Sequence, residues 1–221
     1  MTLALAFPLS VFAIEPMKIQ DNSFLIEEAY NQEPRVVQHI TAFTRDANHH
    51  WNGTFTQEWP MGGIKNQISY TLPLDANTEA LVNYRYQLAG NGEARVACAP
   101  RLSLIVGSRS DRRYGVQALV PVSVAINDRL ATHWNAGATS EHGATTYNGG
   151  ASVIWAALPR VHVMLENVWN SADRKLVVSP GVRWAYDFKS GLQIVPGLAV
   201  PIDTRSHDRS VFLYLSFEQP F

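Results

Sequence analysis

The sequence is 221 residues long, which suits one domain, and no Pro-, Gly- or Ser-rich linker divides it. Charged residues make up 17%, fewer than the roughly 25% usual for soluble proteins. The formal net charge of −1 disfavours nucleic acid as a partner. The single cysteine, Cys98, excludes an internal disulfide framework.

The N-terminus is an apolar stretch from Thr2 to Ile14 that contains Val11-Phe12-Ala13, a small-residue pattern like a signal-peptidase site. A basic leading segment is missing, so an apolar first strand is the alternative interpretation. We expect residues 1–13 to be the remnant of a secretory signal peptide. Nowhere does the sequence offer the roughly 18 uninterrupted apolar residues of a spanning helix, so any membrane crossing must use strands.

A polar segment follows, over residues 14–35. Ser23 is a suitable N-cap for a short helix from Phe24 to Tyr30, which Pro34 would end. We expect this segment, as a loop or a short helix, to sit in the mouth of the structure that the rest of the chain forms.

From Val36 onward the hydrophobic period is two, interrupted at short intervals by turn residues. The last segment is typical, because Val211, Leu213 and Leu215 alternate with polar residues. Even strand numbers are usual in single-chain bacterial barrels. We therefore predict an all-β fold over residues 36–221, a transmembrane antiparallel up-and-down β-barrel of about 12 strands. The predicted strands are Val36 to Thr44, Trp51 to Trp59, Asn66 to Leu74, Ala80 to Leu88, Ala94 to Val106, Tyr114 to Ala125, Leu130 to Thr139, Tyr147 to Ala157, Val161 to Trp169, Leu176 to Asp187, Leu192 to Ile202 and Ser210 to Glu218.

Aromatic residues on the apolar face separate a bilayer barrel from a soluble sandwich. If the C-terminus faces the periplasm, strand direction assigns each aromatic residue to the outer or the inner end of the barrel. Two aromatic girdles result, as the two interfaces of a bilayer select. The outer girdle is Trp51, Tyr114, Tyr147 and Trp169, and the inner girdle is Trp59, Tyr86, Trp155, Tyr186, Phe217 and Phe221.

Connections between the strands are predicted to be short. Asn91-Gly92 and Asn127-Asp128 suit tight hairpins at the inner end. The outer loops Gly107 to Arg113, Ser140 to Thr146 and Asp203 to Arg209 are only slightly longer.

Four prolines inside predicted strands each remove a ladder hydrogen bond, so they must lie at bulges or near the rims. They are Pro100, Pro121, Pro180 and Pro196.

The second half of the chain resembles a family of bacterial outer-membrane barrels labelled as transporters and associated by name with a MetA pathway of phenol degradation. The resemblance lies in the stretch from Pro121-Val-Ser to Asn127-Asp-Arg129, in Thr132-His-Trp-Asn-Ala-Gly137, Ser179-Pro-Gly-Val-Arg-Trp184 and Gly191-Leu-Gln-Ile-Val-Pro-Gly197, and in the ending Phe212 to Phe221. It implies an outer-membrane barrel of a Gram-negative bacterium, with Phe221 resembling the signal read by the outer-membrane assembly machinery. No catalytic motif defines the family.

The inward face of the predicted barrel collects charges of both signs. Such side chains either pair across strands to hold the cylinder's shape, or form a lining in which arginines attract a carboxylate and glutamates balance them. The apolar lumen positions Phe212, Met164 and Leu119 favour small, weakly polar or aromatic solutes. The candidate lumen residues are Glu58, Arg85, Arg95, Arg101, His133, Asn135, His162, Glu166, Arg183, Asp187 and Glu218.

The main hypothesis is therefore a channel or transporter in the bacterial outer membrane, with the bilayer as its environment. An outer-membrane lipid hydrolase needs a lipid-facing nucleophile, and Ser123, Ser152, Ser179 and Ser216 all face inward. We therefore predict no enzymatic activity, no catalytic residue, no cofactor and no metal. A structural barrel with a closed lumen is a further alternative.

Overall fold

A computed structural model of the chain describes residues 23–74, 79–90, 94–107 and 114–221. The predicted signal-peptide remnant, the Asn91-Gly92 turn and most of the Gly107 to Arg113 loop lie outside these residues.

The described residues form fifteen β-strands in one antiparallel sheet. Their bounds are β1 Val36–Arg45, β2 Trp51–Pro60, β3 Asn66–Pro73, β4 Ala80–Tyr86, β5 Val96–Cys98, β6 Arg101–Val106, β7 Tyr114–Asn127, β8 Leu130–Glu141, β9 Ala144–Leu158, β10 Val161–Asn170, β11 Lys175–Trp184, β12 Tyr186–Asp187, β13 Gln193–Ala199, β14 Ile202–Asp203 and β15 Val211–Pro220.

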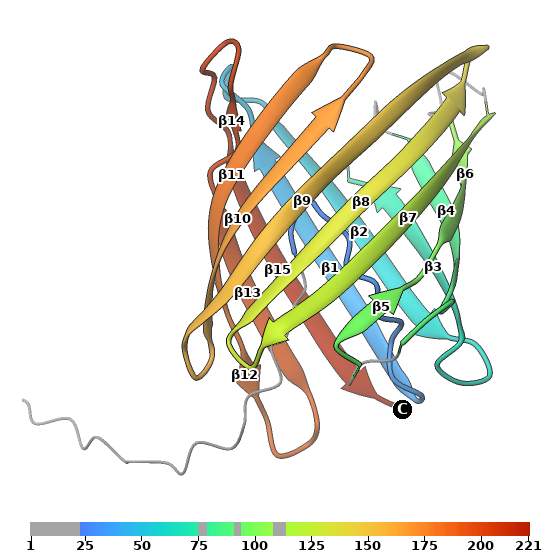
Figure 1. The fold of residues 1–221 in the computed structure, drawn as a ribbon, viewed down its shortest axis with the longest axis vertical. Helices are drawn as coiled ribbons and strands as arrows, with labels where there is room; N and C mark the ends of the chain where they lie inside the picture. The colour runs from blue at the N-terminus through green and yellow to red at the C-terminus, as the bar shows by residue number, and fades with distance from the viewer. Residues whose placement is uncertain (1–22, 75–78, 91–93, 108–113) are drawn as a thin grey trace, which may run out of the picture.

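The sheet closes on itself, because β1 pairs with β2 on one side and with β15 on the other. Three of the barrel strands are interrupted, and each is counted as two elements. The successive parts are β5 and β6, β11 and β12, and β13 and β14. The barrel therefore has twelve strands, as predicted. Val36 pairs with Pro220, so β1 begins at the end where β15 finishes. We call this the inner end and the opposite one the outer end (Figure 1).

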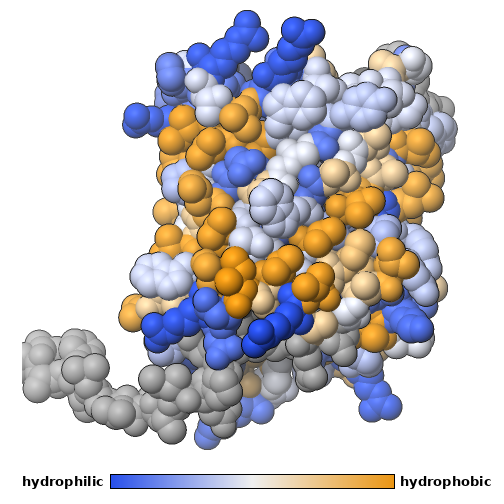
Figure 2. Space-filling view, viewed as in Figure 1, coloured by the Kyte–Doolittle hydropathy of each residue, from blue (hydrophilic) through white to orange (hydrophobic). Residues whose placement is uncertain are grey.

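The barrel is inverted relative to a soluble protein, with its large apolar side chains on the outside. Leu102, Leu165 and Val116 are all at least half exposed, while Gln38, Glu166 and Arg183 are almost fully buried. Figure 2 shows hydrophobic side chains over much of the wall between two hydrophilic ends. An apolar outer band around a closed barrel is the arrangement that a bilayer stabilises.

All ten aromatic residues of the predicted girdles lie on the outer face near strand ends. Eight of them are at least 40% exposed, among them Tyr114 and Phe221, while Trp59 and Phe217 are half-buried. In the described part of the chain, no helix is long and apolar enough to span a membrane.

Strands β8 and β9 extend further than predicted at the outer end. The pairing continues to Glu141 and Ala144, which leaves only His142 and Gly143 as the turn. Both turn residues have positive φ, 53° and 78°, which a two-residue type I′ hairpin requires. The predicted loop Ser140 to Thr146 was thus too long. Because the turn needs only two residues, Ser140 still pairs with Thr145, and Glu141 with Ala144, across the two strands.

The four strand prolines lie where the ladder is interrupted. Pro100 separates β5 from β6, and Pro121 on β7 lies opposite that gap. Pro180 lies opposite the gap between β13 and β14, and Pro196 opposite the gap between β11 and β12. A proline has no N–H to donate, so each lies beside a break that removes the need for one. These interruptions lie within the wall rather than only at the rims.

The residues before β1 do not form the predicted helix from Phe24 to Tyr30. Residues 23–32 are instead an irregular segment inside the barrel, which we call the lumen segment. Ser23 does not cap a helix, because its hydroxyl lies 2.8 Å from the Ser152 hydroxyl on the wall. The prediction failed because the backbone N–H groups of this segment have partners on the barrel wall, as described below.

Candidate functional site in the barrel lumen

Inward-facing side chains of the wall hold the lumen segment by its backbone. The Glu166 carboxylate on β10 accepts from three consecutive N–H groups at its Oε1 atom. These donors are Phe24 at 3.0 Å, Leu25 at 2.9 Å and Ile26 at 3.1 Å. In the predicted helix these three N–H groups would lie in the first turn and would have no i−4 carbonyl, so Glu166 supplies an acceptor that the helix itself would lack.

The middle of the lumen segment is held from β7 and β8. Asn135 accepts a hydrogen bond from the Glu27 N–H at 2.8 Å and donates one to the Glu27 carbonyl at 2.8 Å. The Ser123 hydroxyl accepts from the Ala29 N–H at 2.7 Å and lies 2.6 Å from His133 Nδ1. A side-chain amide that pairs with both backbone groups of one residue acts like a neighbouring strand.

The C-terminal part of the lumen segment is held by glutamines near the inner end. Gln87 accepts from the Asn31 N–H at 2.9 Å and donates to the Ala29 carbonyl at 2.7 Å. Gln67 accepts from the Gln32 N–H at 2.7 Å. The segment therefore runs across the lumen from β10 to β3, bonded to the wall along its length.

Glycines in the wall make room for the apolar side chains of the lumen segment. A Cβ atom on Gly197 would clash with the Phe24 ring, and one on Gly150 would lie 2.6 Å from the Ile26 side chain and would also clash with the Asn167 backbone carbonyl. Phe24 also packs on Phe212, with ring centroids 5.5 Å apart. Sequence reasoning missed this contact, although glycine inside a strand signals close approach by another chain segment.

Four charged residues form a network at the centre of the lumen. Glu27 lies 2.9 Å from Arg101 and 3.2 Å from Arg85, and Arg85 lies 3.8 Å from Glu58. The Arg85 side chain is only 3% exposed. The two guanidinium groups thus already have carboxylate partners, one of which comes from the lumen segment.

The remaining predicted lumen residues divide into two groups. Buried or half-buried positions on the inner wall are occupied by His133, Asn135, His162, Glu166, Arg183 and Glu218. Arg95 and Asp187 are exposed near the inner end and are not buried inside the lumen. Asp187 pairs with Arg160 at 3.6 Å. The alternation of side chains along a strand predicts which face a residue occupies, but it does not predict how near the residue lies to the end of the barrel wall.

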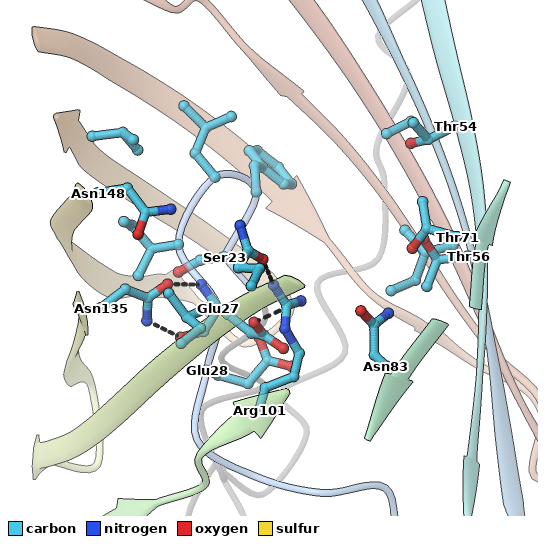
Figure 3. A pocket seen from close by; sticks show the side chains of 18 of the residues that line it. Ser23, Glu27, Glu28, Thr54, Thr56, Thr71, Asn83, Arg101, Asn135 and Asn148 are labelled. Carbon is cyan, nitrogen blue, oxygen red and sulfur yellow. Dashed lines mark hydrogen bonds and ion pairs between the residues drawn. The ribbon is translucent and has the colours of Figure 1, made fainter. Parts of the chain in front are cut away.

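A cavity of about 370 Å³ adjoins the lumen segment. Its wall includes Thr54, Thr56 and Thr71, and the charged pair Glu27 and Arg101 lies beside it (Figure 3). Apolar side chains complete the lining: Phe24, Ile40, Ala42, Leu119, Val168 and Phe212.

The Ser123–His133 pair is the nearest approach to a catalytic arrangement that we find among the described lumen residues. Both side chains are fully buried, and Ser123 is engaged by the Ala29 N–H. A nucleophile must reach its substrate, and a lipid hydrolase needs one that faces the bilayer. This pair serves to hold the lumen segment.

Solved structures of outer-membrane proteins share this fold. The KdgM porin aligns with a TM-score of 0.60 at 11% identity, covering 83% of this chain and 99% of that chain. The KdgM porin in complex with disordered oligogalacturonate aligns with a TM-score of 0.59 at 11% identity, covering 84% of this chain and 99% of that chain. The outer membrane protein Omp33 of Acinetobacter baumannii aligns with a TM-score of 0.51 at 10% identity, covering 84% of this chain and 97% of that chain. No protein-family model and no curated protein matches the sequence.

The predicted fold, a closed antiparallel β-barrel of twelve strands, is therefore confirmed. Its apolar outer band is suited to a bilayer.

Proposed function

We propose that this barrel is a channel for small, uncharged or weakly polar solutes, aromatic ones included, in the outer membrane. The observation that carries the proposal is the cavity inside a closed wall, lined by hydroxyl, amide and apolar groups together with three carboxylates and two guanidinium groups. Among these charges, Glu27 and Glu58 pair with Arg85 and Arg101, so the cavity has little net charge to attract an ion. Leu119 and Phe212 add the apolar contacts that weakly polar solutes need.

The bilayer contacts follow from the same proposal. The two aromatic girdles would sit at the membrane interfaces, and Phe221 would be read by the outer-membrane assembly machinery. The resemblance to the phenol-degradation barrels supports aromatic solutes.

Solute flux through the purified barrel is the direct test. We expect liposomes containing the barrel to swell in a solution of a small neutral solute faster than empty liposomes do. Insertion is checked by heat-modifiable mobility on gels, so that a failure to fold is not scored as a lack of flux. An inserted barrel that gives neither swelling nor single-channel current would contradict the channel.

A structural barrel with a closed lumen is the second candidate, because the lumen segment crosses the interior. A disulfide distinguishes the two candidates. Ser23 Oγ and Ser152 Oγ are 2.8 Å apart and both side chains are buried. In a Cys98→Ser background, Ser23→Cys combined with Ser152→Cys should lock the segment to β9.

If the lumen segment limits flux through a channel, oxidation of the double variant should slow swelling and a reductant should restore it. Ser152→Cys alone is the matched control and should not respond. A closed structural barrel predicts no swelling in either redox state.

A further inference from the structure

We propose that the cavity beside the lumen segment is a binding site for an uncharged, hydroxyl-rich ring compound, such as a monosaccharide. This inference rests on the proposed function and names the solute class for it. Three features of the cavity support it: the unpartnered polar atoms, the apolar wall and the pattern of charge.

Asn83 provides the first observation. Its side chain is only 4% exposed, its Nδ2 donates to Ser69 at 3.0 Å, and its Oδ1 is buried without a hydrogen-bond partner. Asn83 lines the cavity (Figure 3), although its Oδ1 has no accessible surface. Leaving a buried acceptor unpaired costs about 1–3 kcal/mol, so a rotation of the side chain that brings this oxygen to a ligand donor is favoured.

Other polar groups of the cavity match a ligand that both donates and accepts. Asn148 Oδ1 and Arg101 Nε are also buried without partners, and with a similar side-chain rotation they would offer an acceptor and a donor. The Thr56 and Thr71 hydroxyls lie 2.8 Å apart on adjacent strands. Hydroxyl groups donate and accept, so several of them on one ring suit this set.

An apolar surface completes the lining. Phe212 and the segment's Phe24 line the cavity together with Ile40 and Ala42. A sugar ring has apolar C–H faces and a polar edge, so it suits a cavity that has both kinds of surface. The volume of about 370 Å³ lies in the usual range for small-molecule sites, about 300–1,000 Å³.

The charge pattern favours an uncharged ligand. Arg101 contacts Glu27 and also donates to Gln117 at 2.6 Å. Arg85 contacts Glu27 and Glu58. A carboxylate ligand would have to break one of these ion pairs, which is costly away from water. In this respect the cavity should differ from a site for an acidic sugar.

Saturation-transfer NMR on the barrel folded in detergent micelles tests the ligand class without requiring flux. The probes are methyl glucoside, glucuronate as the matched anion and glucosamine as the matched cation. We expect saturable binding of methyl glucoside and clearly weaker binding of the other two. Stronger binding of either charged sugar would overturn the inference.

The variant is Thr56→Val combined with Thr71→Val, which keeps the shape of both side chains and removes the hydroxyls. We expect the Kd for methyl glucoside to rise at least about tenfold, since two hydrogen bonds are lost. Ser179→Ala removes a buried inward-facing hydroxyl outside the cavity lining and should leave the Kd unchanged. An unchanged Kd in the folded double variant would overturn the site.

Liposome swelling separates this inference from the channel itself. Flux of neutral solutes without any glucoside binding would support the channel and overturn the site. Glucoside binding without flux would support the site and contradict the channel.

Discussion

The two sides of the lumen carry similar polar residues but use them differently. On β7, β8 and β10, Ser123, Asn135 and Glu166 bond to the backbone of the lumen segment. On β2 and β3, Thr56 and Thr71 bond to each other and face the cavity. The comparison teaches that a polar inward face does not by itself define a solute path. What crosses the lumen decides which polar groups a solute can reach.

The largest expected effect comes from removing the acceptor on the bonded side. Glu166→Leu leaves the N–H groups of Phe24, Leu25 and Ile26 without their acceptor. At about 1–3 kcal/mol for each of the three unpaired groups, we expect a loss of about 3–9 kcal/mol in the free energy of unfolding. Urea unfolding of the micelle-bound barrel measures it. Glu166→Gln keeps one acceptor oxygen and is the control, which should lose less free energy of unfolding. Equal stability of the leucine variant and the wild type would contradict this role of Glu166.

Glu27 joins the two sides, because it belongs to the lumen segment and contacts both arginines. Glu27→Gln leaves Arg85 and Arg101 with fewer carboxylate partners. Glu27 is 19% exposed, so we expect a loss of about 2 kcal/mol rather than the 3–5 kcal/mol of a fully buried pair. Reversal potentials should also shift toward anions. The exposed Glu33→Gln is the control, and a shift of equal size there would count against the network.

A smaller effect should follow from filling the contact between the wall and Phe24. Gly197→Ala places a methyl group against the Phe24 ring, whereas Gly149→Ala meets only the Asn135 carbonyl at 3.4 Å. Overpacking costs about 1–3 kcal/mol, so we expect that loss for Gly197→Ala and less than about 0.5 kcal/mol for Gly149→Ala. Melting midpoints from gel mobility give the comparison. Equal midpoints for the two variants would contradict tight packing of the segment.

The smallest expected effect lies outside both sides of the lumen, at the outer end. The pKa of Asp203 is lowered to about 2, mainly because its carboxylate accepts a hydrogen bond from the Arg205 N–H, with Lys175 3.1 Å away. A lowered pKa stabilises the fold above the unfolded value, near 4, and this contribution disappears as the pH falls toward 2. Wild type and Asp203→Asn should therefore differ slightly at pH 6 and converge at pH 2. A constant difference in melting midpoint would exclude this cause.

Strand-level features of the barrel were predictable because they are local. Each residue of a strand points to one face or the other, so alternation alone indicated that Glu58, Arg85 and Arg183 face inward. The split strands were not predictable, since ladder breaks depend on where a proline meets its neighbour strand. Pro196, for example, lies opposite the gap between β11 and β12.

Placement of the lumen segment could not be predicted, because its partners are distant in sequence. Local signals at Ser23 and Pro34 favoured a helix, but the acceptor for the Phe24 N–H is 142 residues away. Glu27 was missed for the same reason. Gly150 and Gly197 were the local signals, because a glycine inside a strand indicates that another chain segment approaches the wall closely.

The sequence by itself determined a twelve-strand barrel with an apolar outside, a polar inside and aromatic strand ends, because side-chain direction in a strand has a period of two. The tertiary structure alone decided that residues 23–32 cross the lumen and that the remaining space is a cavity of about 370 Å³. The physical reason is that backbone N–H groups bond to whichever acceptors the closed wall brings within reach, and closure joins residues that lie far apart in the chain.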